Sequence, residues 1–496
     1  MNQIRRAALV VALVPACFAL TAAERPVTSS GIDHEGFDKS VRPQDDLFRH
    51  VNGGWISSTE IPAERSYYGS FIQLAEKAES DLRAIIEEAA RTGGPEGSEA
   101  QKVGDLYASF MDDKAAETNG IEPIKAELER VEAIGDKSAF LGALGSLQRE
   151  GVSGLFGLYI DTDAKRSDRY IPYLNQGGLG LPDESYYRDP KFEKVREAYV
   201  AHVAKMFELA GRPDPKGSAR DVMALETRLA KSHWDRVKSR DDTLTYNKKD
   251  VEGLTKLTPG FDWAAWVDGA KAPHADEVIV RQPEYFSAMA QALDEVPIDH
   301  WKRWLTWNVL RAHAPLLSTP FVEENFAFYG KTLTGAQEIR PRWKRGVSVV
   351  EAALGEAVGK LYVARHFPPA AAARMRDLVK NLVAAYREDI ETLDWMSPET
   401  REKAIEKLEK FTPKIGHPAT WRDYSALTIK RGDLVGNVRR AEAFEFDRQL
   451  NKLGKPVDRG EWLMTPQTVN AYYNPGMNEI VFPAAILQPP FFDMNA

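Results

Sequence analysis

The histidines are the first residues to test for metal chemistry, because neutral imidazole is a common zinc ligand. A zinc peptidase helix carries two histidines four residues apart in an HExxH motif, so that both rings face one ion while the glutamate activates water. No two histidines of this chain have that spacing, and His34-Glu35 is followed by Asp38 where a second histidine is required. Each histidine is therefore interpreted as an isolated surface or core residue, and no metal ligand is predicted among His34, His50, His202, His233, His274, His300, His313, His366 and His417.

Signatures of nucleophilic and nucleotide chemistry are also missing from the sequence. It contains no G-x-S-x-G elbow, no Walker phosphate loop and no dinucleotide-binding glycine pattern. The single cysteine, Cys17, lies in an N-terminal apolar segment, and carboxylates on amphipathic helices are typical of solvated faces. Motifs alone thus predict no catalytic residue in this chain.

A hairpin near the C-terminus suggests a binding role instead. Thr468 to Tyr473 reads as a strand, and Asn478 to Phe482 as a returning strand that Pro483 ends by removing a ladder donor. Between them, Asn474-Pro475-Gly476 places proline and glycine at the second and third positions of a type II turn. An unpaired strand edge binds extended peptides through its own N–H and C=O groups.

Asn470 would add a side-chain amide to such an edge. The alternative is that Asn470 only satisfies a turn while Tyr472 and Tyr473 pack, and the residue types leave both interpretations open.

The part of the chain that precedes this hairpin is predicted to be mostly helical. Apolar residues recur at three- or four-residue steps from residue 70 to about residue 450. Residues 71–92 form one such helix, with the stripe Leu74, Ala78, Leu82, Ile85 and Ala89. A second follows the N-cap Ser397 and Pro398, with a predicted buried stripe of Ala404, Ile405, Leu408 and Phe411.

Strand signals are few. Residues 155–163 and 168–176 are predicted to pair as a hairpin, and no repeat of fixed period is found. The composition changes near residue 460, where helix formers give way to Thr, Val, Tyr, Asn and Pro. The predicted fold class is therefore mainly α.

Bulk composition excludes several classes of function. The 496 residues are 43% hydrophobic and 28% charged, as in ordinary globular proteins. A net charge of -8 with interspersed signs argues against nucleic acid as a partner and against a polybasic membrane-binding surface. The sequence carries no signal for the oligomeric state.

The first 23 residues read as a secretory signal peptide. Arg5 and Arg6 precede an apolar stretch that is too short for a stable membrane span, and small residues up to Ala23 suit cleavage. Lipoprotein anchoring at Cys17 is the weaker interpretation, because Pro15 suits that site poorly. We expect an exported protein without disulfides and without a transmembrane span after cleavage.

Two long blocks give the chain a family resemblance. VNAYYNPGMNEIVFPAAILQPPFF (469–492) resembles the segment just before the zinc site of neprilysin-type zinc metallopeptidases, the family of neprilysin, endothelin-converting enzyme and bacterial oligopeptidase O. PQDDLFRHVNGGWISSTEIPAERSYYGSF (43–71) is similar to the opening motif of that family. Between them, LPDESYYRD, ALETRLAKSHWDRVKSRDD, TYNKKD, GFDWAAW and WLMTPQT also resemble family segments, so the resemblance runs from Pro43 to the end.

The resemblance implies a large helical N-terminal domain followed by a thermolysin-like catalytic domain. After the signal peptide at 1–23 and a polar, unpatterned segment read as an extended arm at 24–44, it implies a helical peptidase domain at 45–450 and the start of the catalytic domain at 451–496, ending after its first β-hairpin. It implies oligopeptide substrates, and it gives the substrate-binding role of the family's edge strand to Asn470 and Ala471.

The family's HExxH motif would lie beyond Ala496, so we expect a chain truncated before the zinc site. Zinc is then expected in a full-length parent, with none bound by this chain, which would be inactive alone. One alternative is a non-catalytic peptide-binding or scaffolding protein. Another is a misfolded fragment, in which apolar residues between Ile480 and Phe492 lack the layer they pack against.

One departure from the family bears on specificity. Tyr67 stands where relatives that prefer a free substrate C-terminus carry an arginine, and Arg65 lies two residues earlier. Loss of a bidentate carboxylate clamp favours endopeptidase activity. Because its single cysteine lies in the predicted signal peptide, the chain cannot form the disulfides of vertebrate relatives, and a bacterial periplasmic or secreted location is expected.

Overall fold

The computed structural model describes residue 32 and residues 34–494, which fall into two compact units, residues 32–60 and 61–494. The predicted signal peptide and Cys17 lie outside the described residues. In the first unit, the described part of the predicted arm contains the 3-10 helix η1 (His34–Gly36). The helix α1 (Leu47–Ser58) follows, and begins where the Asp46 carboxylate accepts the Arg49 N–H at 2.8 Å.

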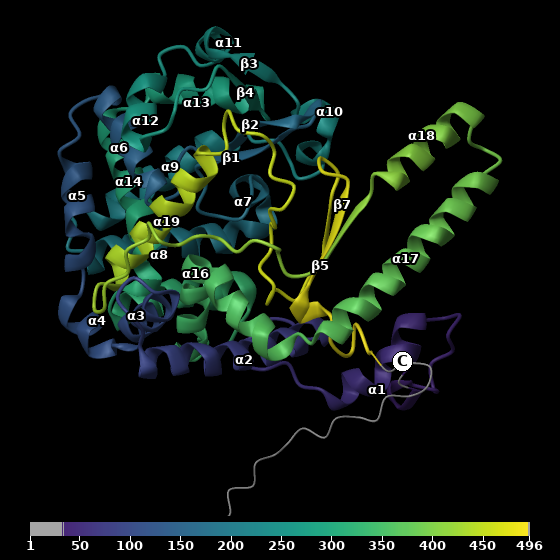
Figure 1. The fold of residues 1–496 in the computed structure, drawn as a ribbon. Helices are drawn as coiled ribbons and strands as arrows, with labels where there is room; N and C mark the ends of the chain where they lie inside the picture. Colours follow the sequence, from purple (N-terminus) through teal and green to yellow (C-terminus); the bar gives the residue numbers. More distant parts are fainter. Residues whose placement is uncertain (1–31, 33, 495–496) are drawn as a thin grey trace, which may run out of the picture. The chain divides into compact units, whose positions relative to one another are not determined.

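The second unit is mainly helical, as the periodicity predicts (Figure 1). The helix α2 (Ser70–Thr92) buries its whole predicted stripe and ends at Gly93. It is followed by α3 (Glu99–Met111), α4 (Asp113–Asn119), α5 (Lys125–Glu132), α6 (Lys137–Arg149), α7 (Ser185–Arg188), α8 (Glu193–Leu209), α9 (Pro215–Ala230), α10 (Asp242–Thr245), α11 (Val251–Leu257), α12 (Trp263–Ala270), α13 (Pro283–Glu295), α14 (Ile298–His313) and α15 (Thr319–Asn325).

The largest core of this unit gathers around α14. Its side chains Trp301, Trp304 and Trp307 are fully buried, and α14 packs against α5, α6, α8 and α9. Phe140 of α6 contacts Trp301 with ring centroids 5.5 Å apart. Each buried aromatic side chain removes roughly 150–250 Å² from water, so this region holds most of the apolar burial.

A four-stranded sheet lies beside these helices, with strand order β1-β2-β4-β3. The predicted hairpin is confirmed as β1 (Phe156–Asp163) and β2 (Arg166–Gln176), which pair antiparallel. The sequence did not indicate β3 (Lys248–Asp250) and β4 (Glu277–Val280), because three or four residues are too few for a period-2 pattern to show.

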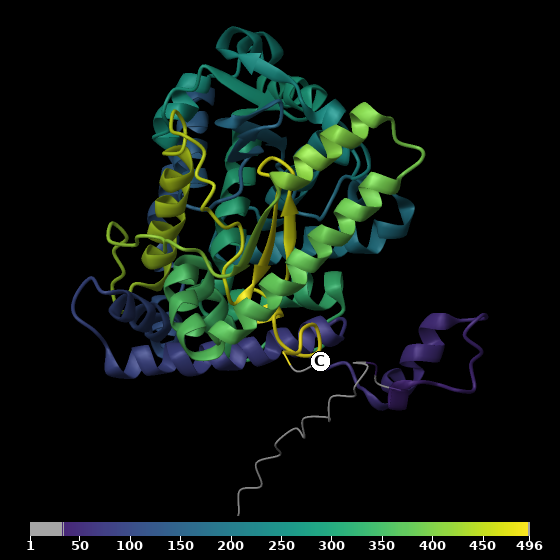
Figure 2. The same cartoon turned by 45° about the vertical axis from the view of Figure 1, so that its right-hand side comes forward.

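The rest of the second unit contains the long helices α16 (Arg342–His366), α17 (Pro369–Thr392), α18 (Pro398–Glu409) and α19 (Leu434–Leu450). A small sheet of order β5-β7-β6 joins β5 (Thr412–Gly416), β7 (Glu479–Pro483) and β6 (Tyr472–Asn474). Strands β6 and β7 form the predicted hairpin, whereas β5, which pairs parallel to β7, was not predicted. Figures 1 and 2 show α17 and α18 as a helical hairpin that extends away from the other helices of this unit.

The predicted burial of the α18 stripe is wrong. The helix begins as predicted, with Ser397 Oγ accepting the Thr400 N–H at 3.2 Å, but no residue of α18 is buried. Ala404, Ile405 and Leu408 are only half-buried, because α18 packs mainly on α17.

The expectation that the C-terminal apolar residues lack a packing layer is also wrong. Leu487 and Phe492 are buried with Met375 and Val379 of α17, and Val481 is fully buried. Phe491 stays 40% exposed. No described helix combines the length and apolar character that a bilayer-spanning segment needs.

Candidate functional site

The predicted substrate-binding residues lie directly before the edge strand β6. Asn470 is exposed and Ala471 is half-buried, and β6, which starts at Tyr472, pairs only with β7 in its sheet. The predicted strand from Thr468 is too long, because local hydrogen bonds compete with the ladder. The Asn470 N–H donates to the Thr468 carbonyl at 3.0 Å, and the Ala471 N–H donates to Asn470 Oδ1 at 2.8 Å.

Asn470 therefore both closes a local turn and stands exposed at the start of an edge strand. Its Oδ1 atom accepts the hydrogen bond of the turn, and its side-chain NH₂ group has no hydrogen-bond partner among the described residues. The structure contains the turn contact that the alternative interpretation requires, and the substrate-binding role of Asn470 stays a prediction.

The segment before Asn470 is docked against a kink in α16. Leu354 has non-helical angles, φ -133° and ψ 30°, and the neighbouring Gly355 carbonyl accepts a hydrogen bond from Gln467 Nε2 at 2.8 Å. A Cβ atom at Gly359 would lie 2.6 Å from Gln467 Oε1, so the close approach depends on glycine there. The sequence gives Gln467 no role beyond its place in the WLMTPQT motif, because its docking depends on a kink that periodicity does not reveal.

The hairpin turn differs from the predicted type II turn. Gly476 does not have the positive φ that such a turn requires, and Asn478 takes the left-handed conformation instead, with φ 51°. The Asn474 side chain explains the change, because its Oδ1 accepts the N–H groups of Gly476 at 3.0 Å and Met477 at 3.3 Å. This side-chain turn fixes the loop between β6 and β7.

A buried ion pair supports the sheet beneath this edge. Lys414 of β5 and Glu479 of β7 approach to 2.7 Å, and their side chains are 10% and 2% exposed. Lys414 Nζ also donates to the Glu461 carbonyl at 2.8 Å. Removing one partner would leave a buried charge unpaired, so this pair ties β5 to β7 and to the preceding segment.

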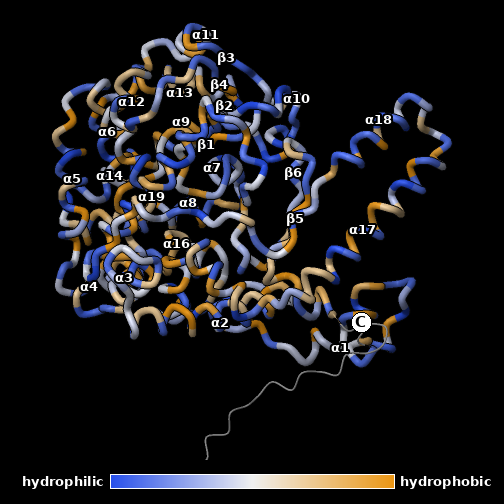
Figure 3. Tube along the Cα trace, viewed as in Figure 1, coloured by the Kyte–Doolittle hydropathy of each residue, from blue (hydrophilic) through white to orange (hydrophobic). Residues whose placement is uncertain are grey.

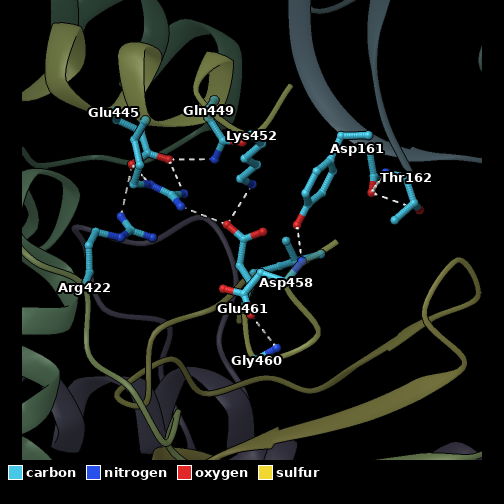
Figure 4. Close-up of polar contacts among 12 residues, drawn as sticks. Asp161, Thr162, Arg422, Glu445, Gln449, Lys452, Asp458, Gly460 and Glu461 are labelled. Carbon is cyan, nitrogen blue, oxygen red and sulfur yellow. Dashed lines mark hydrogen bonds and ion pairs between the residues drawn. The ribbon is translucent and has the colours of Figure 1, made fainter. Parts of the chain in front are cut away.

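A network of charges anchors the segment between α19 and β6 (Figure 4). The Glu461 carboxylate accepts from Lys452 at 2.7 Å and from Arg448 at 2.9 Å. Arg448 also donates to Glu445 of α19 at 2.8 Å, and Arg422 donates to Glu445 at 3.1 Å. Burial raises the pKa of Glu461, but the two cations lower it overall. Charge-assisted hydrogen bonds thus set the point from which the chain enters β6.

Tyr472 completes the anchoring at the first residue of β6. Its hydroxyl oxygen accepts the Leu463 N–H at 2.9 Å, and burial raises its pKa to about 12. Tyr473 on the next position is 46% exposed. The groups exposed at this edge are amides, a hydroxyl and main-chain atoms, which suit the holding of a peptide backbone rather than proton transfer.

The structure also describes Arg65 and Tyr67, the residues near the position where some relatives carry an arginine clamp. Arg65 pairs with Glu76 at 3.2 Å, and Tyr68 donates to the same carboxylate at 3.3 Å. Tyr67 is 66% exposed. Arg65 is therefore already engaged inside the helical unit.

The described residues do not fit a zinc site. In residues 32 and 34–494, no group of three or more His, Cys, Asp or Glu side chains is placed to hold a metal ion. Several histidines have structural partners instead: His202 contacts Glu324 at 2.7 Å, and His313 bonds the Val309 carbonyl at 2.9 Å. His233 bonds the Gly177 carbonyl at 2.9 Å, and burial lowers its pKa to about 4.

One buried carboxylate was missed in the sequence. Glu226 of α9 accepts hydrogen bonds from Tyr187 at 2.6 Å and Tyr199 at 3.0 Å, and burial raises its pKa to about 7. The sequence could have indicated its burial, because Glu226 lies four residues after Val222 and three before Leu229, on the apolar stripe of α9. Its partners are structural, so it belongs to the core and not to the β6 edge.

Comparisons with known proteins agree with the resemblance. Residues 43–418 match a profile described as peptidase family M13, and residues 470–496 match a second profile of that description. The chain is 29% identical to rat endothelin-converting enzyme-like 1 over 92% of its own length and 62% of that protein, and 28% identical to rat endothelin-converting enzyme 1 over 97% and 65%. It thus spans less than two thirds of these relatives.

Two solved structures are similar in fold. The zinc metalloprotease Zmp1 of Mycobacterium tuberculosis, in complex with an inhibitor, is 52% identical with a TM-score of 0.90, covering 93% of this chain and 71% of Zmp1. PepO from Lactobacillus rhamnosis is 25% identical with a TM-score of 0.82, covering 92% and 73%.

Proposed function

The chain belongs to peptidase family M13, a family of zinc metallopeptidases, and from that membership we propose that it functions in an exported zinc metalloendopeptidase acting on oligopeptides. In this proposal, residues 45–450 are a helical domain and residues 451–496 begin a thermolysin-like catalytic domain. The N-terminal 23 residues support export to a periplasm or to the medium.

The exposed start of β6 carries the proposal. Asn470 and Ala471 lie directly before β6, which pairs with β7 on one side only, and the preceding chain is fixed by Gln467 and by the Glu461 network. A fixed edge loses little conformational freedom when a peptide pairs with it, which favours binding. Asn470 would donate its side-chain amide to a substrate carbonyl, and Ala471 would offer its carbonyl to a substrate N–H.

The proposal assigns no chemical step to these residues. Because the described residues do not fit a zinc site, we propose that this chain by itself binds peptide without hydrolysing it. The exposed Tyr67, in place of an arginine clamp, supports endopeptidase specificity in the whole protein.

Calorimetric binding of a blocked, uncharged peptide to the 496-residue chain tests the proposal. The probe is Ac-Thr-Val-Nle-Val-Thr-NH₂, in which Nle is norleucine. We expect Asn470→Ala to weaken binding at this edge by about 1–3 kcal/mol, the scale of one hydrogen bond left unmade. Asn119→Ala, which changes an exposed asparagine at the end of α4, is the matched control and should leave binding unchanged.

Two results would contradict the proposal. Equal affinity of the Asn470→Ala variant and the unchanged chain removes Asn470 from the binding role. Tight stoichiometric zinc binding by this chain, with peptide cleavage that a chelator stops, refutes the proposal that it binds without hydrolysis.

A further inference from the structure

The four-stranded sheet has a free edge at β1. In the order β1-β2-β4-β3, β1 pairs with β2 on one side and with no strand on the other. In an antiparallel pair, the N–H and C=O groups of alternate residues point away from the partner strand. Two observations show which main-chain groups of β1 point away from β2: the hydrogen bonds at the two ends of the strand, and the residues that lie opposite its centre.

The two ends of β1 show that the main-chain N–H and C=O groups of its even-numbered residues point away from β2. The Phe156 carbonyl accepts from the Gln148 side chain at 2.8 Å. At the other end, the Thr162 N–H donates to Asp161 Oδ1 at 2.6 Å, a contact visible in Figure 4. Both groups therefore have partners outside β2.

The residues opposite the centre of β1 lead to the same conclusion. Ile160 lies opposite Pro172, which has no N–H to donate across the pair. Leu158 lies opposite Leu174, whose carbonyl is turned the other way and accepts the Arg281 N–H at 2.9 Å. The N–H and C=O groups of Leu158 and Ile160 thus point to the free side of the sheet.

These groups face a groove. Beside Leu158 and Ile160 its other wall is α19, and beside the start of β1 it is bounded mainly by residues 176–184 and 233–239. A cavity of about 600 Å³ is lined by Gly154, Phe156, Gly157 and Leu158, and one of about 190 Å³ by Leu158, Ile160 and Glu442. The two cavities share Gln148, Leu158 and Phe446 in their linings, so together they follow the edge of β1. Sites of roughly 300–1,000 Å³ hold small ligands and short peptides.

The groove carries one charge that no cation balances. Glu442 is exposed on α19 and has no hydrogen-bond or ion-pair partner among the described residues, and its stem lies over Gly151. The other carboxylates of the lining are paired: Glu445 with Arg422 and Arg448, Asp183 with Arg236, and Glu184 with Arg188. Charge complementarity therefore favours a basic side chain in the part of the groove next to Glu442.

We propose that the groove between β1 and α19 is a second peptide-binding site. An extended peptide segment pairs with the main chain of Leu158 and Ile160 and places a lysine or arginine side chain beside Glu442. The inference takes its ligand class from the proposed function, but it depends on none of the residues at the β6 edge. It predicts that peptides with a basic residue bind this chain at two independent places.

The test compares two peptides by fluorescence anisotropy: labelled Ac-Thr-Val-Lys-Val-Thr-NH₂ and the norleucine analogue. At the β1 groove, we expect the lysine peptide to bind about tenfold more tightly, the scale of one charge-assisted contact. Glu442→Gln should remove this difference. Glu391→Gln, an exposed glutamate of α17 outside the groove, is the matched control and should preserve it.

Main-chain pairing is tested separately. A lysine peptide with N-methylated valines should bind the groove about tenfold more weakly, because it has lost its main-chain donors. Leu158→Pro removes an outward N–H that the ladder does not use and should have the same effect, whereas Leu158→Ala keeps the N–H and most of the affinity. Thermal melts establish that each variant is folded, and the N-methylated peptide tests pairing without any variant.

The outcomes separate the two proposals. Binding of the lysine peptide that persists in Asn470→Ala and falls in Glu442→Gln supports the β1 groove. Binding that is lost in Asn470→Ala and unchanged in Glu442→Gln and Leu158→Pro overturns this inference and leaves the proposed function standing. Equal affinity for both peptides, or for the N-methylated peptide, also overturns it.

Discussion

The helical region around α14 and the hairpin α17–α18 both follow amphipathic patterns, yet they bury very different amounts of apolar surface. Nine residues of α14 are buried, and none of α18. On α17 and its connection to α18, Leu378, Leu382, Tyr386 and Trp395 are 44–74% exposed. Figure 3 shows hydrophobic positions along α17, which contacts α18 and β5.

The difference shows that apolar periodicity predicts a helix but does not predict which other elements will pack on its apolar face. In α14, other helices approach from several sides, so apolar residues outside a single stripe are also buried. The hairpin α17–α18 depends instead on its cap, on the contact between its two helices and on the small sheet. Four variants test this contrast, and they should have decreasing effects.

The largest effect is expected for Phe140→Ala in the main core. Phe140 is fully buried against Trp301, so its removal should lower the free energy of unfolding by about 3–5 kcal/mol through lost burial and a cavity. Denaturant titration measures the loss. Leu382→Ala on the exposed face of α17 is the control, and a comparable loss there would contradict the contrast drawn above.

Lys414→Met should come next, because it leaves Glu479 charged and buried without its partner. We expect about 3 kcal/mol of destabilisation, confined to the β5-β7-β6 sheet and the packed end of α17. Hydrogen exchange measured segment by segment would show which part of the chain is destabilised. Protection lost around α14 to the same extent would show that the two regions unfold as one unit.

A pH dependence of about 2–3 kcal/mol is expected from Glu226. Burial raises its pKa from 4.5 to about 7 in the folded state, so the folded protein binds the extra proton between these values. Stability is therefore complete below pH 4.5 and decreases as the pH rises through about 7. Glu226→Gln should flatten this slope in melts between pH 5 and 8, and an unchanged slope would assign it to another group.

The smallest effect is expected for Ser397→Ala. It removes the hydrogen bond from the Thr400 N–H at the start of α18, for a cost of about 1 kcal/mol. Circular dichroism is insensitive to one turn of helix, so hydrogen exchange at residues 399–401 is the better measurement. Ser397→Asp retains a capping oxygen and should behave as the unchanged chain.

Much of the local structure was predictable because it depends on neighbours in the chain. The α2 stripe, the Ser397 cap, the β1–β2 hairpin and the strand that ends at Pro483 were all indicated by spacing and by turn residues. The type II turn was not, because the Asn474 side chain bonds the turn amides and moves the left-handed residue to Asn478. Asn470 was singled out by its place before the predicted hairpin and was given a substrate-binding role by the resemblance, and that role stays a prediction.

The sequence by itself determined the mainly helical fold, the hairpin near the C-terminus and the family, because periodicity and motifs are carried by residues close together in the chain. Only the tertiary structure decided that Gln467 docks on the kink of α16, that Lys414 meets Glu479, and that β1 is left with an open edge beside α19. Each of these depends on segments far apart in sequence, and their meeting is set by packing across the whole unit rather than by any local pattern.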